Sequence, residues 1–108
     1  MNRALLVVGL MAAFFCGSAF AGNGSGNVTQ VGAVENGIVV FSTVVHTGTP
    51  TCVATQQWAI NTTTVQGKGI YALLLTAVND GKAVTVTGGN VCDVYGGIET
   101  AIRLYVNY

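Results

Sequence analysis

The residues that could carry chemistry in this chain are few. His46 is its single histidine, and the serines beyond residue 21 are Ser25 and Ser42. A hydrolase triad needs a serine hydroxyl within hydrogen-bond reach of the histidine. Ser42 and His46 stand four residues apart in a run that is typical of a strand, so they share a face but lie too far apart to touch. The spacing therefore argues against a serine hydrolase.

The acidic residues are equally sparse. Glu35 and Asp80 stand beside asparagine and glycine, where acidic side chains commonly stabilise turns. Asp93 and Glu99 flank a glycine-rich segment, but a glycosidase pair needs a separation of about 5 to 10 Å and a surrounding cleft. We interpret them as a solvated loop pair. One histidine and scattered carboxylates are too few for a metal site, so we expect no enzyme activity, cofactor or metal.

The beginning of the chain predicts export. A short positive segment precedes an apolar run over residues 4–15, and small residues lead up to Ala21. This pattern predicts a signal peptide over residues 1–21 with cleavage after Ala21, no membrane span after cleavage, and a secreted or periplasmic location. Cys16 suggests a lipoprotein as the alternative, but Phe15 is too large for the residue preceding a lipidated cysteine.

Cleavage leaves two cysteines, Cys52 and Cys92. An exported protein with an even number of cysteines usually pairs them. Closing this loop stabilises the fold by about 4 kcal/mol on the chain-entropy description. Free thiols in a catalytic or metal-binding role are the alternative, although no Cys-x-x-Cys spacing supports it.

The composition excludes two classes of protein. Only 7% of the residues are charged, 51% are hydrophobic and the formal net charge is zero. Intrinsic disorder requires low hydrophobicity and high charge. Nucleic-acid binding requires clustered lysine and arginine, so we expect no nucleic-acid partner.

The hydrophobic pattern predicts three strands, one helix and two further strands. Thr63 and Gln66 fit a capping box at the start of the helix, and Gly81 fits its C-terminal cap. This order matches an OB-fold, a five-stranded β-barrel with its helix between the third and fourth strands; a small open α+β sheet is the alternative. In chain order we expect a flexible leader over 22–27, then a single domain over 28–108 with strands over 28–34, 38–46 and 51–60, a helix from 63 to about 80, and strands over 82–87 and 100–108.

Two strand features are more specific. Asn36-Gly37 between two apolar runs is a strong hairpin signal, since both residues tolerate positive φ. In the last strand, Ile102, Leu104 and Val106 alternate with polar residues and should share one face.

The predicted helix has no charged residue from Ile70 to Val78. A helix that is apolar nearly all round is buried on more than one side. One small domain cannot cover both sides, so we expect a homo-oligomer that uses Tyr71, Leu75 and Val78.

A ligand would be bound at loops and exposed aromatic residues. The segments 47–50 and 88–97 should form a binding edge, whereas Trp58 is expected in the core. The candidate ligand-binding residues are Thr47, Thr49, Asp93, Tyr95 and Tyr105.

Residues 37–48 (GIVVFSTVVHTG), followed by Cys52 and later by Gly81-Lys82-Ala83-Val84-Thr85-Val86, resemble the B subunits of subtilase-type and typhoid-type bacterial toxins. The resemblance implies an OB-fold, a pentameric ring with helices lining the pore, and binding of cell-surface glycans. The sugar-contacting serine of those subunits falls near Ile38 and is missing here, and Cys92 has no clear counterpart. The chain is also similar, through Trp58-Ala59-Ile60-Asn61 and its leucine-rich helix, to short exported proteobacterial proteins of unknown function.

The sequence therefore favours an exported, non-enzymatic, self-associating OB-fold protein that binds a ligand, with a glycan implied by the toxin resemblance. The alternative is a structural component that assembles in the bacterial envelope or at the cell surface.

Overall fold

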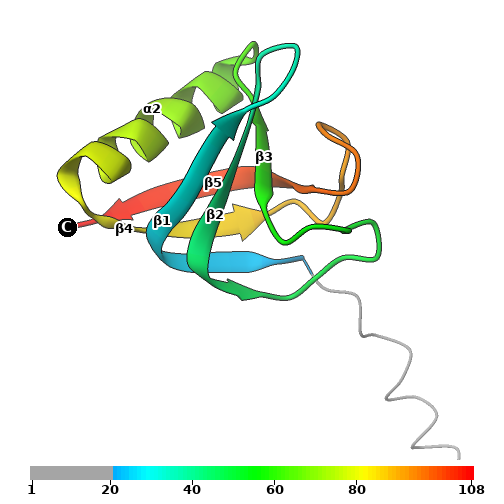
Figure 1. The fold of residues 1–108 in the computed structure, drawn as a ribbon, viewed down its shortest axis with the longest axis horizontal. Helices are drawn as coiled ribbons and strands as arrows, with labels where there is room; N and C mark the ends of the chain where they lie inside the picture. Colours follow the sequence, from blue (N-terminus) through cyan, green and yellow to red (C-terminus); the bar gives the residue numbers. More distant parts are fainter. Residues whose placement is uncertain (1–20) are drawn as a thin grey trace, which may run out of the picture.

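The computed structural model describes residues 21–108, so the predicted signal peptide lies, apart from Ala21, outside the described residues. The protein is mainly β, with a single helix in the described part (Figure 1). Its elements are β1 (Asn23–Ala33), β2 (Ile38–Thr47), β3 (Trp58–Asn61), α2 (Val65–Asp80), β4 (Ala83–Gly88) and β5 (Glu99–Asn107).

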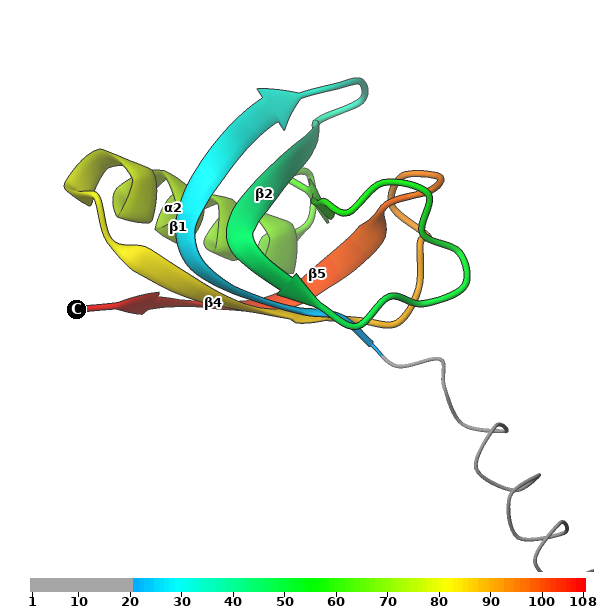
Figure 2. The ribbon, with the colours of Figure 1, turned by 60° about the horizontal axis from the view of Figure 1, so that its bottom comes forward.

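The five strands form one closed sheet in the order β1-β2-β3-β5-β4, with β1 paired to both β2 and β4. Every neighbouring pair is antiparallel except β3 and β5, which pair in parallel over only Trp58↔Glu99 and Ala59↔Thr100. The predicted order of strands and helix is confirmed. Helix α2 contacts β1, β3, β4 and β5, and so packs across one end of the closed sheet (Figures 1 and 2).

The expectation of a flexible leader over residues 22–27 is wrong. This segment begins β1, where Gly24 is paired with both His46 of β2 and Val86 of β4. A Cβ at Gly24 would press on Trp58 and Thr43, so the glycine allows the strand to lie directly against the core. Gly26 has φ 92° beside a shift in register. The strand bends there, so that its first residues pair with both β2 and β4.

The hairpin between β1 and β2 is confirmed. Asn36 has φ 55° and Gly37 has φ 74°, as a two-residue hairpin turn requires. The amide of Ile38 closes the turn by donating to Glu35 O at 3.0 Å.

The third strand is shorter than predicted, because it begins at Trp58 rather than at residue 51. The amide of Ala54 donates to Gly97 O at 2.8 Å, which ties the preceding loop to a second loop instead of to a strand. The predicted disulfide between Cys52 and Cys92 is confirmed and joins the same two loops, with 6.0 Å between the Cα atoms.

The helix boundaries differ from the prediction by one residue at the start. Thr64, not Thr63, is the N-cap, and its Oγ1 accepts from Gly67 N at 3.0 Å. Gln66 does not complete a capping box; its Nε2 donates to Ile102 O at 2.7 Å. Gly81 is the C-cap with φ 66°, as predicted.

The main core lies between α2 and the inner face of the sheet. Its largest members are fully buried: Phe41, Trp58, Ile60, Leu74, Val84 and Val86. The expected common face of Ile102 with Leu104 is wrong, since Ile102 is 40% exposed and Leu104 is buried. Residue 102 is skipped in the pairing of β5 with β4, and this irregularity turns it outwards.

None of the helices within residues 21–108 has the length and hydropathy needed to cross a membrane.

Candidate functional site

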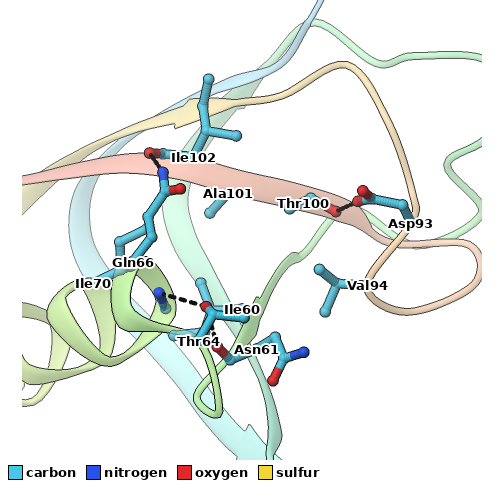
Figure 3. Close-up of a pocket in the computed structure, with 11 residues that line it drawn as sticks. Ile60, Asn61, Thr64, Gln66, Ile70, Asp93, Val94, Thr100, Ala101 and Ile102 are labelled. Atoms are coloured by element: carbon cyan, nitrogen blue, oxygen red, sulfur yellow. Dashed lines mark hydrogen bonds between the residues drawn. The ribbon is translucent and has the colours of Figure 1, made fainter.

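The candidate site is a groove of about 370 Å³ beside the first turn of α2 (Figure 3). It opens where β3 and β5 separate after their short parallel pairing. Its floor is apolar and its rim is polar. The lining residues come from β3, the start of α2, the loop before β5, and β5: Ile60, Asn61, Thr64, Gln66, Gly67, Ile70, Asp93, Val94, Thr100, Ala101 and Ile102.

Asn61 ends β3 at the lower rim of the groove. Its Oδ1 accepts from Thr63 N at 3.0 Å and from Thr63 Oγ1 at 2.6 Å. The Nδ2 group takes no part in these bonds, and Figure 3 shows it turned away from the turn that Oδ1 caps. Asn61 therefore has a fixed orientation and an amide donor that remains for a ligand.

The first turn of α2 is fixed against β3. Thr64 Oγ1 donates to Asn61 O at 3.0 Å. A Cβ at Gly67 would overlap the same carbonyl oxygen, so glycine is required for this close approach. Gln66 reaches across the groove to Ile102 O, and its Oε1 stays outside that bond (Figure 3).

Asp93 forms the opposite rim. Its Oδ1 accepts from Thr100 Oγ1 at 2.6 Å (Figure 3), which leaves Oδ2 as a charged acceptor. Asp93 also borders a second hollow of about 380 Å³ beside the Cys52–Cys92 disulfide. The groove thus presents an amide donor, an amide acceptor and a carboxylate above an apolar floor. This set can bind hydroxyl-rich small molecules, and it lacks a nucleophile paired with a base.

The structure brings only one of the five predicted ligand-binding residues into this groove, namely Asp93. Thr47 ends β2 and donates through Oγ1 to Asn23 O at 3.3 Å, and Thr49 Oγ1 accepts from Gln56 at 3.4 Å. Tyr95 is half-buried against Val40, Ala59 and Ile98. Tyr105 is 57% exposed on β5, opposite Thr85.

Asn61 and Gln66 were missed as groove residues. Asn61 follows directly on the apolar run of β3, which is a usable signal for a polar group at the end of a strand. The spacing of Thr63 and Gln66 predicts a capping box, and nothing local in the sequence shows that the partner of Gln66 is Ile102 O.

The helix residues predicted to form an interface lie along one stripe of α2. Leu75 is 44% exposed and Val78 is 49% exposed, whereas Tyr71 is half-buried and packs against the core. Leu73, on another part of the helix, is also 43% exposed.

A second polar centre surrounds Glu99, which has no exposed surface. The interpretation of Asp93 and Glu99 as a solvated loop pair is therefore wrong for Glu99. It begins β5 with its side chain turned inwards, where it accepts backbone N–H groups from Gly22 and Asn90. A Cβ at Gly88 would collide with the carboxylate, so glycine makes the space for it.

His46 lies beside this centre. Its ring stacks on Trp58 with 4.3 Å between the ring centroids and 12° between the planes. Both ring nitrogens are buried without a hydrogen-bond partner among residues 21–108. Burial lowers the pKa of His46 below 6.5, and the negative charge of Glu99 opposes this shift. This environment favours a neutral packing residue and, within the part of the chain that the structure describes, offers the ring no hydrogen-bond partner that could orient a catalytic base.

Across residues 21–108, no three side chains of histidine, cysteine, aspartate or glutamate gather into a group that could hold a metal ion. Comparison of the chain with protein-family models, curated proteins and solved structures finds no match.

Proposed function

We propose that this protein is an exported, non-enzymatic binding module with an OB-fold, which takes a hydroxyl-rich ligand such as a glycan in the groove between α2 and β5. The observation that carries the proposal is the groove itself. Its polar rim and apolar floor follow the usual pattern of small-molecule sites, and its volume lies within their range of about 300 to 1,000 Å³.

The strand order supports the OB-fold part of the proposal. A five-stranded Greek-key barrel of this type has one helix between its third and fourth strands. Here α2 lies between β3 and β4, and β1 is shared by β2 and β4. The predicted signal peptide supports export, and the disulfide is consistent with an oxidising compartment.

The chemistry of the rim supports a sugar-like ligand. Sugar hydroxyls donate and accept at once, so they suit a site in which amide donors and carboxylate acceptors stand together. Asn61 Nδ2 and Asp93 Oδ2 have these roles, and their partner oxygens are already held by Thr63 and Thr100. The free groups are therefore oriented before a ligand arrives, which lowers the entropic cost of binding.

A glycan array probed with the purified mature protein tests the function. Asn61→Ala and Asp93→Ala should each weaken binding of any glycan found by about tenfold, because each removes a hydrogen bond to the ligand. Thr49→Ala and Tyr105→Ala are matched controls at other sites and should leave the affinity unchanged.

Three outcomes would contradict the proposal. The absence of binding to any glycan removes the glycan part. Weaker binding in Thr49→Ala or Tyr105→Ala, with normal binding in Asp93→Ala, would move the site to the loop edge. Enzymatic turnover that disappears in His46→Ala would contradict a non-enzymatic role.

The exposed apolar stripe of α2 favours a second role in self-association, of the kind that a ring-forming or envelope component needs. Leu75 and Val78 are about half exposed on a helix segment without charges. Light scattering on a sizing column should give a defined oligomer that dissociates in Leu75→Lys. Thr76→Lys, on another exposed face, is the control and should keep the oligomer; a monomeric wild-type protein would contradict this role.

A further inference from the structure

The residue that precedes β1, Gly22, lies against a buried carboxylate, Glu99, that has no basic hydrogen-bond partner among residues 21–108. Glu99 accepts from Gly22 N, which lies 3.1 Å from Oε1 and 3.0 Å from Oε2, and from Asn90 N at 3.0 Å. All of the hydrogen bonds that it accepts within residues 21–108 come from backbone amides. A carboxylate without exposed surface loses its hydration, and uncharged donors replace that hydration only in part.

Gly22 is the residue that cleavage after Ala21 would leave at the N-terminus. In the uncut chain its nitrogen is an amide with a single hydrogen. Hydrolysis of the Ala21–Gly22 peptide bond by one water molecule leaves a carboxylate on Ala21 and an amine on Gly22. This amine takes up a proton near neutral pH, because a free α-amino group has a pKa of about 8.

We propose that cleavage of the signal peptide converts Gly22 N into an ammonium group that forms a buried ion pair with Glu99, and that this pair stabilises the mature fold relative to the uncut chain. The inference rests on the export and cleavage included in the proposed function, and it is independent of the groove and its ligand.

The surroundings of Gly22 fit an ammonium group at this position. Its nitrogen already lies at nearly equal distances from the two oxygens of Glu99, so two of the three hydrogens of the ammonium group have acceptors in place. Gly22 O accepts from Gly88 N at 2.9 Å, which anchors the residue independently of Ala21. Figure 2 shows the start of β1, in blue, running along β4 within the sheet.

Only glycine fits as the first residue of the mature chain. A Cβ at Gly22 would press on Glu99 Oε1, Gly48 O and the Trp58 ring. Asn90 has φ 63°, a conformation uncommon outside glycine, and its amide is thereby directed at Glu99 Oε2. The protein is therefore closely packed around the Glu99 carboxylate. Residue 22 has no room for a side chain, and its nitrogen faces the two carboxylate oxygens.

The ion pair has a defined pH dependence. Glu99 raises the pKa of the α-amino group in the folded protein above its unfolded value of about 8. The stabilisation is therefore complete below about pH 8 and is lost as the pH rises through the folded pKa. His46, on β2, is the other titratable group coupled to Glu99. It titrates below pH 6.5, outside this window.

The experiment begins with the full chain expressed with export, whose intact mass should show a mature protein that begins at Gly22. Residues 22–108 contain every strand and the helix described above, so chains beginning at Gly22 or at Ala21 can then be compared by urea unfolding. The Gly22 chain should have an unfolding constant about tenfold smaller at pH 7. The difference should disappear above pH 10 and in Glu99→Gln. A mature protein that begins elsewhere, or equal stability of the two chains, would overturn the proposal.

A second measurement avoids dependence on the folding of Glu99→Gln. The α-amino group of wild-type Gly22 can be titrated by NMR, and its pKa should lie at least about one unit above the usual value near 8. Titration at the usual value would overturn the ion pair. Neither measurement involves a ligand, so failure on the glycan array and failure of the ion pair are separate results.

Discussion

Two carboxylates in the same short segment of this chain have opposite surroundings. Glu99 is fully buried and its oxygens are occupied by the amides of Gly22 and Asn90. Asp93 is exposed, accepts one bond from Thr100, and borders the groove. A polar group whose bonds are all made inside the protein holds the structure together, whereas one with an acceptor to spare can serve a ligand. By this difference, the polar centre around Glu99 is structural, whereas the groove beside Asp93 is the candidate binding site.

The largest effect is expected from removal of the buried carboxylate. Glu99→Ala leaves the nitrogens of Gly22 and Asn90 without their acceptor and opens a cavity, so it should lower the free energy of unfolding by about 3 kcal/mol. Urea unfolding followed by tryptophan fluorescence measures this value. Glu35→Ala, an exposed carboxylate in the β1–β2 turn, should change it by less than about 0.5 kcal/mol. Equal effects of Glu99→Ala and Glu35→Ala would show that the buried carboxylate contributes no more to stability than an exposed one.

A glycine pair provides the next test of the same centre. Gly88→Ala forces a methyl group into the Glu99 carboxylate and should cost about 2 kcal/mol in the free energy of unfolding. Gly69→Ala adds the same methyl on α2, where nothing lies within 4 Å, and should stabilise the protein by about 0.5 to 1 kcal/mol. Thermal unfolding of both variants gives the comparison, and a stabilising Gly88→Ala would contradict the tight fit.

Protonation of His46 should make the protein less stable at acidic pH. Because burial lowers the pKa of His46 in the folded protein, the unfolded chain binds more protons, and the free energy of unfolding should fall as the pH drops below about 6.5. His46→Phe keeps a ring that can stack on Trp58 and cannot titrate, so its stability should fall less between pH 7 and pH 5. Parallel pH profiles for the two proteins would show that His46 is not the cause.

The smallest effect on stability is expected at the groove. Asp93→Asn retains an acceptor for Thr100 Oγ1 and removes only the charge, so the free energy of unfolding should change by less than about 0.5 kcal/mol. Affinity for a glycan should nevertheless fall, and calorimetry can measure both quantities in one preparation. A large loss of stability would place Asp93 with the structural residues.

The sequence predicted much of the fold because local signals determine many of its parts. Asn36-Gly37 specifies a turn through positive φ, and Gly81 ends the helix for the same reason. The predicted export, together with an even number of cysteines after residue 21, made the Cys52–Cys92 pairing predictable. These features depend on a few neighbouring residues or on the predicted compartment, and not on distant contacts.

The errors arose where distant segments decide the outcome. Gly22 and Gly24 have the composition of a linker, but each allows close packing against Trp58, which lies far along the chain. Glu99 was misplaced for the same reason, since its partners Gly22 and Asn90 come from two other segments. The groove depends on the first turn of α2 lying against β5. Asn61 has a local signal, as the polar residue that ends β3, but nothing in the sequence near Gln66 indicates its bond to Ile102 O.

The short parallel pairing of β3 with β5 has a consequence for local opening. Two residue pairs join these strands, at Trp58 and Ala59, whereas β1 and β2 pair along most of their length. The closed sheet therefore has one seam with few hydrogen bonds, and the groove begins where this seam ends. We expect amides along the seam to exchange with deuterium sooner than those between β1 and β2. A ligand that touches Asn61 and Asp93 together would bridge the seam and slow that exchange.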